Sequence, residues 1–285
     1  MDMTATGRAI SDARKKSGLT QEELAGRIGV SPQAVSKWEN GHNLPDIENM
    51  MRIAEITNVP YSAFLAGDGA EEQTPLSPPR TRLFQEGNMF TRIRTASYSE
   101  GLKETYRAVQ YMREKHAGQF RNKSRFSEER VLYINHPLVM ACQAHAFGIR
   151  DDALLAAILL HDVVEDTGVA LGDLPFSPEV REIVGLVTFS VPEGKTKEEA
   201  KDEYYGRIRR NGKACVVKII DRCSNVSTMA ASYQIKRMLR YIDETENRIL
   251  PLCDELKHNY PEYSDLAFLV KYQIMSIIET IKCMI

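Results

Sequence analysis

The apolar stretch 153–160, Ala-Leu-Leu-Ala-Ala-Ile-Leu-Leu, constrains the fold of this chain more than any other segment. A helix that is apolar on every side is buried rather than solvated. It runs directly into His161 and Asp162, and Glu165 and Asp166 follow within one turn. Residues four apart share a helix face, so we expect His161 above Glu165 and Asp162 above Asp166. Charged groups at the end of a buried helix lower its stability unless they are used, and they therefore predict a functional site.

The composition is that of a globular protein with a real core, because 43% of the 285 residues are hydrophobic. The sequence contains neither a run long and apolar enough to span a membrane nor a signal peptide, so we expect a cytoplasmic protein without a membrane partner. Its five cysteines form no Cys-x-x-Cys pair, which predicts reduced thiols, mostly in the core. A net charge of −2 excludes a protein that coats nucleic acid through charge alone.

Three regions follow from the distribution of turn and linker residues. They are a first domain over residues 1–66, a linker over 67–88 rich in Gly, Pro, Ser and acidic residues, and a second domain over 89–285. No strand-like alternation of apolar and polar residues is present, so we expect an all-α protein. The helices expected in the second domain are 99–116, 137–147, 152–165, 178–187, 195–210, 214–238, 246–259 and 264–283.

The first domain contains the signals of two short helices around a tight turn. Thr20 and Glu23 form a capping box, and Ser31 precedes a proline that is well placed in a first helical turn. Helices over 21–28 and 32–39, separated by Gly29, have helix-turn-helix spacing, in which the second helix is the recognition helix.

Residues 19–25 (LTQEELA), 30–41 (VSPQAVSKWENG) and Pro45 resemble the Cro/repressor-type (XRE-like) helix-turn-helix family. The resemblance implies a five-helix domain that binds double-stranded DNA. It further implies that the residues of the second helix that face the major groove are Gln33, Ala34, Ser36 and Lys37. Gln21, at the start of the first helix, and Asn40, after the second, would approach phosphates.

The charge of the first domain limits how tightly it can hold DNA. Residues 1–66 carry seven basic and eight acidic side chains, whereas phosphate neutralisation supplies most nonspecific affinity. A single domain would therefore bind weakly, and we expect a homodimer if DNA is the ligand. The alternative is that this domain binds a protein partner or itself.

The second domain carries metal-binding residue types at the ends of three apolar helices. These are His136, then His161 with Asp162, then Asp221, which shares a helical stripe with Asn225 and Thr228. A single histidine on an apolar helix is more often a hydrogen-bonded core residue, but this order of groups resembles the HD phosphohydrolase superfamily. Two imidazoles and two carboxylates suit Mn²⁺, Fe²⁺ or Zn²⁺ better than Mg²⁺ or Ca²⁺.

A closer resemblance is to the hydrolase domain of RelA/SpoT-type enzymes, which hydrolyse the alarmones ppGpp and pppGpp at the 3′ position. It rests on segments 116–124, 133–137, 156–167, 195–199 and 218–225. The resemblance implies one Mn²⁺ held by His136, His161, Asp162 and Asp221. It implies that Glu165 and Asp166 serve the attacking water, and that a guanosine nucleotide is bound by Arg121, Lys123, Ser124, Asn225 and Thr228.

Two departures from the family pattern affect base recognition. Residues 125–132 intervene before the Tyr-Ile-Asn-His-Pro motif, and Cys223-Ser224 replace the Leu-His that often precedes Asn225. The substrate can therefore differ from the family's, and the assignment of the segment 121–124 stays open. The length of the chain predicts a small, hydrolase-only enzyme.

We therefore expect a metal-dependent (p)ppGpp 3′-pyrophosphohydrolase fused to a DNA-binding regulatory domain. One alternative keeps the metal site but changes the substrate to a 3′-diphosphate on tRNA ends or to NADPH. Another is a nucleotide-sensing transcription regulator or antitoxin, for example a neutraliser of an alarmone-synthesising toxin. The pair Glu165 and Asp166 favours turnover, because water activation needs such carboxylates and sensing does not.

Overall fold

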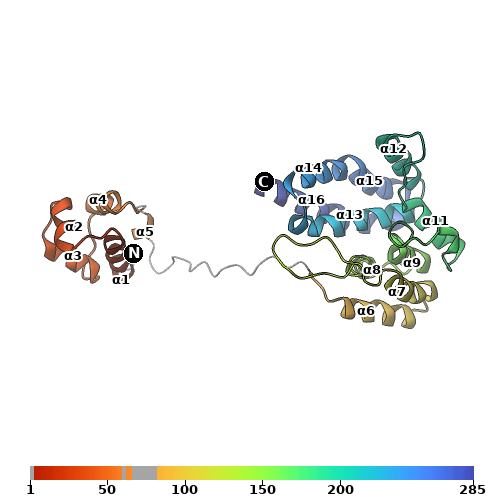
Figure 1. Cartoon of the computed structure of the whole chain (residues 1–285), viewed down its shortest axis with the longest axis horizontal. Coiled ribbons are helices and arrows are strands. Elements are labelled where there is room, and N and C mark those ends of the chain that lie inside the picture. Colours follow the sequence, from red (N-terminus) through yellow and green to blue (C-terminus); the bar gives the residue numbers. More distant parts are fainter. Residues whose placement is uncertain (1–2, 60–61, 66–81) are drawn as a thin grey trace. The chain divides into compact units, whose positions relative to one another are not determined.

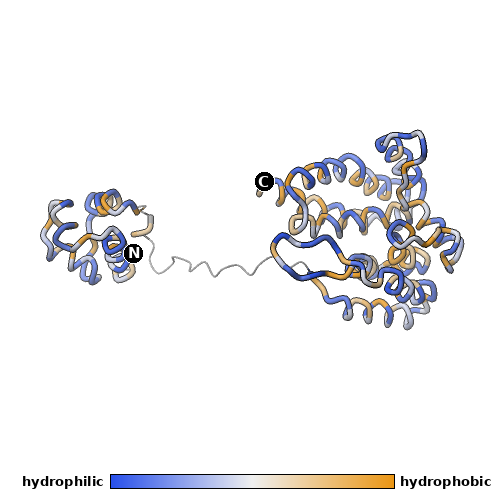
Figure 2. The backbone as a smooth tube through the Cα atoms, in the orientation of Figure 1, coloured by the Kyte–Doolittle hydropathy of each residue, from blue (hydrophilic) through white to orange (hydrophobic). Residues whose placement is uncertain are grey.

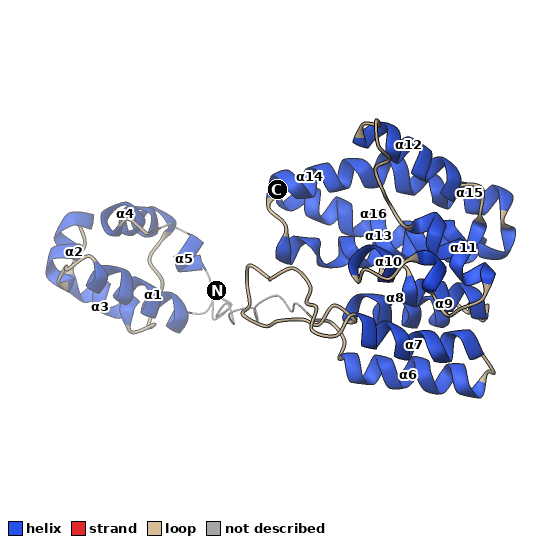
Figure 3. Cartoon of the chain, turned by 45° about the vertical axis from the view of Figure 1, so that its right-hand side comes forward, coloured by secondary structure: helices blue, strands red, loops and turns tan. Residues whose placement is uncertain are grey.

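The structure is a computed structural model that describes residues 3–59, 62–65 and 82–285 (Figure 1). The chain divides into two compact units, residues 1–77 and 78–285. Throughout the described residues the regular elements are helices (Figure 3), which confirms the all-α expectation. A single antiparallel bridge between Phe120 and Leu132 is the β-type pairing found in these ranges. No helix in the described part of the chain combines the length and the apolarity that a bilayer crossing requires.

The N-terminal unit has the five helices that the helix-turn-helix resemblance implied, and local capping fixes where two of them begin. The Thr20–Glu23 capping box is formed, and the hydroxyl of Ser31 accepts a hydrogen bond from the backbone N–H of Ala34. The core of this unit contains Leu24, Val35, Trp38 and Ile53. The helices are α1 (Met3–Lys16), α2 (Gln21–Ile28), α3 (Pro32–Glu39), α4 (Ile47–Thr57) and α5 (Ser62–Leu65).

The C-terminal unit is organised around α9 (Asp152–Leu160), in which all eight residues from Ala153 to Leu160 are buried. Helices α7, α8, α11 and α13 pack against it and turn their apolar sides inward (Figure 2). The other helices are α6 (Glu86–Ser99), α7 (Lys103–Lys115), α8 (Asn135–Ala146), α10 (Val163–Asp166), α11 (Pro178–Val187), α12 (Lys197–Ile208), α13 (Gly212–Ser232), α14 (Ile235–Glu244), α15 (Leu250–Asn259) and α16 (Ser264–Met284). Short 3₁₀ turns lie at Leu171–Asp173 and Pro261–Tyr263, and a π-helical turn at Thr245–Ile249.

The start of this unit differs from the prediction. Most of the expected linker, residues 67–81, lies outside the described residues. Helix α6 begins at Glu86, before the predicted end of the linker at residue 88. The single helix expected over 99–116 is also wrong in its first turns. Gly101, with a φ of 72°, separates α6 from α7 in a left-handed conformation that glycine adopts readily.

The helix expected over 214–238 is likewise interrupted, because α13 ends at Ser232. The inserted loop contributes to this end. The backbone N–H of Arg125 donates to the carbonyl of Ala231 at 2.8 Å, and its guanidinium donates to the carbonyl of Ala230 at 2.9 Å. The last carbonyls of a helix lack intrahelical partners, and here Arg125 supplies hydrogen-bond donors to two of them, so the helix can end at this point.

A third difference lies at the predicted site. The helix expected over 152–165 is broken at His161 and Asp162, which fall between α9 and α10. Nδ1 of His161 lies 2.9 Å from the carbonyl oxygen of Ile158 and takes up one of the last carbonyls of α9. The imidazole is thereby fixed by its own helix end.

Candidate active site

Three separate segments bring the four predicted metal ligands together. His136 comes from the first turn of α8, His161 and Asp162 from the α9–α10 junction, and Asp221 from α13. Ligand atoms of the first three all lie within 4.8 Å of one another. Oδ1 of Asp221 lies 3.2 Å from Nε2 of His136 and 4.0 Å from Nε2 of His161. The cluster is buried, except that Asp162 is half-buried.

The surroundings of His161 fit a cation. A carbonyl oxygen can only accept, so Nδ1 carries the proton that binds Ile158, and Nε2 presents a lone pair when the ring is neutral. Nε2 is buried and has no hydrogen-bond partner among the described residues, although Oδ2 of Asp162 lies only 2.9 Å away. Two acceptors this close require a proton or a metal ion. Burial alone would lower the pKa of His161, but the Asp162 carboxylate outweighs it and raises this pKa to about 9.

His136 is held in the complementary state. Its Nδ1 lies 2.9 Å from the hydroxyl oxygen of Ser224, one of the residues at which the chain departs from the family pattern. Burial, assisted by the Arg121 guanidinium, lowers the pKa of His136 to about 4. The ring is therefore neutral near pH 7, which is the form that binds a metal.

Both aspartates are held by further side chains. The hydroxyl of Tyr133 donates to Oδ2 of Asp162. Nδ2 of Asn225 donates to Oδ1 of Asp221 at 2.6 Å, and Nζ of Lys218 lies 2.9 Å from Oδ2 of the same carboxylate. Burial would raise the pKa of Asp221, but the Lys218 ammonium group holds it well below its usual range. Such outer partners orient metal ligands.

The acidic pair, Glu165 and Asp166, lies on α10, directly after the cluster. Both side chains are exposed. Glu165 accepts a hydrogen bond from the backbone N–H of Phe189, and desolvation against the protein raises its pKa. Asp166 is fixed through its backbone, since its carbonyl accepts from Nε2 of Gln119 at 2.9 Å. The pair can thus meet both solvent and the edge of the cluster.

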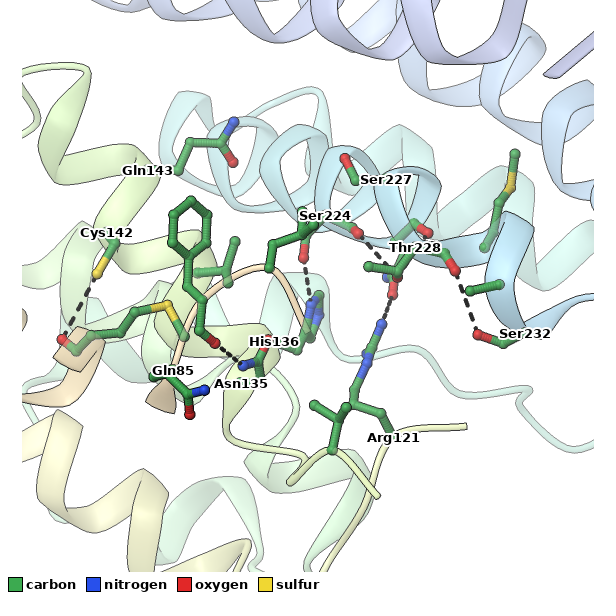
Figure 4. Close-up of a pocket in the computed structure, with 18 of the residues that line it drawn as sticks. Gln85, Arg121, Asn135, His136, Cys142, Gln143, Ser224, Ser227, Thr228 and Ser232 are labelled. Carbon is green, nitrogen blue, oxygen red and sulfur yellow. Dashed lines mark hydrogen bonds between the residues drawn. The ribbon is translucent and has the colours of Figure 1, made fainter. Parts of the chain in front are cut away.

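A cavity of about 500 Å³ opens beside the cluster, a size typical of small-ligand sites. Four predicted residues line it, namely Arg121, His136, Asn225 and Thr228. Figure 4 shows Arg121, His136 and Thr228 around the cavity. Arg121 reaches from the loop before α8 toward α13, where its Nη2 donates to Oδ1 of Asn225 at 2.8 Å. Arg121, Asn225 and Asp221 therefore form a continuous chain of contacts from the cavity to the cluster.

Two predicted substrate-binding residues do not line this cavity. Lys123 is exposed and lies 2.8 Å from a carboxylate oxygen of Glu128. Ser124 is buried, and its hydroxyl accepts a hydrogen bond from the backbone N–H of Phe126. The inserted residues after position 124 provide both partners, and Glu129 and Val131 of the same insertion line the cavity.

Sequence reasoning did not single out several cavity and cluster residues. Tyr133 and Asn135 belong to the Tyr-Ile-Asn-His-Pro motif, from which only His136 was predicted as a site residue. Lys218 is a lone charge on an apolar helix, a pattern that indicates a functional or paired residue. Phe84 also lines the cavity, but it falls in the predicted linker and carried no signal.

The predicted DNA-contacting residues lie on and around α3. Gln33 and Lys37 are exposed, and Ser36 is half-buried. Ala34 packs partly against the core of the unit and so offers little surface to a groove. Asn40 is exposed, and its amide donates to the carbonyl of Ser36.

Gln21 has a structural partner as well. Its Nε2 donates to Oε2 of Glu39 at 2.8 Å. Glu39 also forms a buried ion pair with Arg14, in which Nε lies 2.6 Å from Oε1. These contacts join α1, α2 and the end of α3, so they fix the orientation of the recognition helix.

Comparison with known proteins agrees with both resemblances. The helix-turn-helix family matches residues 10–64. A guanosine-3′,5′-bis(diphosphate) 3′-pyrophosphohydrolase of Haemophilus influenzae is 32% identical over 165 residues, which cover 55% of this chain and 23% of that protein. The guanosine-3′,5′-bis(diphosphate) 3′-pyrophosphohydrolase MESH1 of Xenopus tropicalis is 44% identical over 84 residues, which cover 28% of this chain and 45% of that protein. The chain thus spans less than half the length of these relatives.

The fold of the C-terminal unit is also that of a solved structure. It is described as a metazoan ortholog of SpoT that hydrolyses ppGpp and plays a role in starvation responses. The TM-score is 0.50 at 22% identity, and the match covers 62% of this chain and 94% of the other. The chain therefore joins a helix-turn-helix domain to a domain with the all-helical fold expected of an HD-type hydrolase.

Proposed function

We propose that the C-terminal unit is a metal-dependent pyrophosphohydrolase that removes the 3′-diphosphate of ppGpp and pppGpp. The observation that carries this proposal is the cluster of His136, His161 and Asp162, with Asp221 against His136, beside a cavity of about 500 Å³. The similarity to proteins named as 3′-pyrophosphohydrolases supports the choice of substrate.

The four ligands would hold a divalent cation, and we propose Mn²⁺ because imidazole and carboxylate together suit it. When bound, such an ion neutralises charge on a diphosphate and makes a nearby water more acidic. His136 would contribute an already neutral nitrogen to this set, and His161 would lose its Nε2 proton when the ion binds, while Tyr133 and Lys218 keep the two aspartates oriented.

The remaining chemistry is a hydrolytic displacement. A water oxygen attacks the phosphorus attached to the ribose 3′-oxygen and forms a new P–O bond. The bond between that phosphorus and the 3′-oxygen breaks, and pyrophosphate and GDP or GTP are released. Glu165 accepts the proton of the water, assisted by Asp166, and the freed 3′-oxygen takes up a proton. A group that accepts a proton must release it to solvent before the next reaction cycle. Glu165 fits this role because its pKa is raised and its side chain is exposed.

Arg121, Asn225 and Thr228 would bind the nucleotide, since they line the cavity next to His136. We propose double-stranded DNA as the partner of the N-terminal unit, read by Gln33, Ser36 and Lys37 from α3 and bound by a homodimer in the cytoplasm. The exposure of Gln33 and Lys37 supports this assignment.

Incubation of the purified chain with Mn²⁺ and ppGpp tests the proposal, with GDP and pyrophosphate separated by ion exchange. We expect both products from the wild type and from Asp265→Ala, an exposed control on α16, but not from Asp162→Ala. Equal product from Asp162→Ala and the wild type would disprove the proposal. A parallel panel with NADPH and tRNA 3′-diphosphates identifies an alternative substrate if ppGpp is inert.

A further inference from the structure

The segment before α6 is fixed at the edge of the cavity by contacts on two sides. The Arg82 guanidinium lies 2.7 Å from a carboxylate oxygen of Glu86 and forms a second ion pair with Glu129 of the inserted loop. Nδ2 of Asn135 donates to the carbonyl of Phe84 at 2.9 Å and to Oε1 of Glu86 at 3.0 Å. The backbone of Phe84 therefore has a defined position relative to α8.

That position is next to the metal ligands. Asn135, which holds the backbone of Phe84, is the chain neighbour of His136 (Figure 4). The side chain of Phe84 lines the same cavity as His136, Ser224 and Asn225. Phe84 and the proposed metal ligand His136 therefore line one cavity.

The ring is unusually open for a phenylalanine, since 60% of Phe84 is exposed. Among the described residues, no aromatic ring and no cation stacks on it, whereas the exposed Phe120 and Phe126 of the adjacent loop are covered by Arg130 and Arg125. An exposed aromatic face inside a ligand cavity matches a flat, apolar ligand group.

We propose that Phe84 is the stacking surface for the nucleobase of the substrate, an inference that rests on the proposed nucleotide hydrolysis. Every base has a π-face, so stacking accepts a purine without reading its edge. The phenyl ring lies in the same cavity as the Arg121 guanidinium, which would then be free to meet phosphate or ribose oxygens. The segment that presents the ring also follows directly on the residues that connect the two units.

The binding of GDP, a product that the enzyme does not consume, tests this assignment. We expect Phe84→Ala to weaken GDP binding by about tenfold to a hundredfold, the usual range for loss of one aromatic–base stack, and to leave inorganic pyrophosphate binding unchanged. Phe268→Ala, the same substitution at an exposed position of α16 outside the cavity, should bind both ligands as the wild type does.

Phe84→Trp adds a direct signal, because the natural chain has one tryptophan, Trp38, buried in the other unit. GDP should quench the new emission, and pyrophosphate should not. Wild-type GDP affinity in Phe84→Ala, an equal loss for GDP and pyrophosphate, or no GDP binding by the wild type would each overturn the inference. If the chain hydrolyses ppGpp but Phe84→Ala binds GDP normally, only the stacking role of Phe84 is wrong. If GDP binding depends on Phe84 but ppGpp is not hydrolysed, only the proposed reaction is wrong.

Discussion

The Nζ atom of Lys218 lies 2.9 Å from Oδ2 of Asp221, one helical turn along α13. Both side chains are largely shielded from solvent, with exposed fractions of 18% and 10%. Oδ1 of Asp221 faces the other way, 3.2 Å from Nε2 of His136. The carboxylate therefore joins a protein cation on one side to the candidate metal ligands on the other.

Lys218→Met should destabilise the metal-free protein by about 3–5 kcal/mol, the usual effect of removing one partner of a buried ion pair. A divalent cation would compensate, because it neutralises the unpaired Asp221 carboxylate. Thermal unfolding with EDTA and with Mn²⁺ measures both effects, and Lys236→Ala on the exposed side of α14 serves as the control. If Mn²⁺ stabilised Lys218→Met no more than the wild type, Asp221 would not be a metal ligand.

Glu165→Gln should lower kcat by about 10²–10⁴, the range for loss of a proton-transferring group, while Mn²⁺ binding stays intact. Only the ionised carboxylate accepts a proton, and desolvation raises the pKa of Glu165. The rate of the wild type should therefore fall, as pH decreases, at a higher pH than an ordinary glutamate would give. pH profiles of kcat/KM measure this acid limb.

The matched control is Glu182→Gln, an exposed glutamate on α11. It should keep both the rate and the acid limb of the wild type. A Glu165→Gln variant with an unchanged profile would assign proton transfer to Asp166 or to another group.

Local sequence signals were sufficient for much of this molecule. The Thr20–Glu23 capping box predicted the start of α2 because both partners lie within four residues. The burial of residues 153–160 followed from their composition alone. The grouping of His136 with Asp221 was implied by the family resemblance and not by periodicity, since Asp221 lies in the middle of α13 rather than at its end.

The remaining features depend on contacts between distant segments, which periodicity does not contain. The break at His161 arises from a hydrogen bond of its own ring, and α13 ends where Arg125 of the inserted loop meets its carbonyls. The same loop supplies Glu128, the ion-pair partner of Lys123, which does not line the cavity. Phe84 could not be assigned because its neighbours resemble a linker, and its position depends on Asn135.

Lys37→Ala should weaken the binding of mixed-sequence double-stranded DNA and reduce its salt dependence. One lost phosphate contact lowers the slope of log K against log salt by about 0.9. Fluorescence anisotropy over a salt series measures the slope, with Lys236→Ala in the C-terminal unit as the control. An unchanged slope would place Lys37 outside the phosphate contacts and favour a protein partner for this domain.

Glu244 gives the stability of the C-terminal unit a defined pH dependence. One of its carboxylate oxygens lies 2.7 Å from Nη2 of Arg222, and the other 2.5 Å from Nζ of Lys201. Burial alone would raise the pKa of Glu244, but these two cations outweigh burial and lower the pKa to about 2. Because the folded pKa lies below the unfolded value of about 4.5, the contribution is complete above that value and is lost as pH falls toward 2.

Glu244→Gln should therefore reduce the free energy of unfolding near pH 7 by about 3 kcal/mol and flatten its decline between pH 5 and pH 2. Urea unfolding in EDTA, followed by near-UV circular dichroism of the tyrosines, measures the C-terminal unit, while Trp38 fluorescence reports the other unit separately. Glu279→Gln, which removes an exposed carboxylate near Lys282, should change neither the level nor the slope. An equal loss of stability at pH 7 and at pH 2 in Glu244→Gln would mean that packing, rather than the charge of Glu244, holds α12, α13 and α14 together.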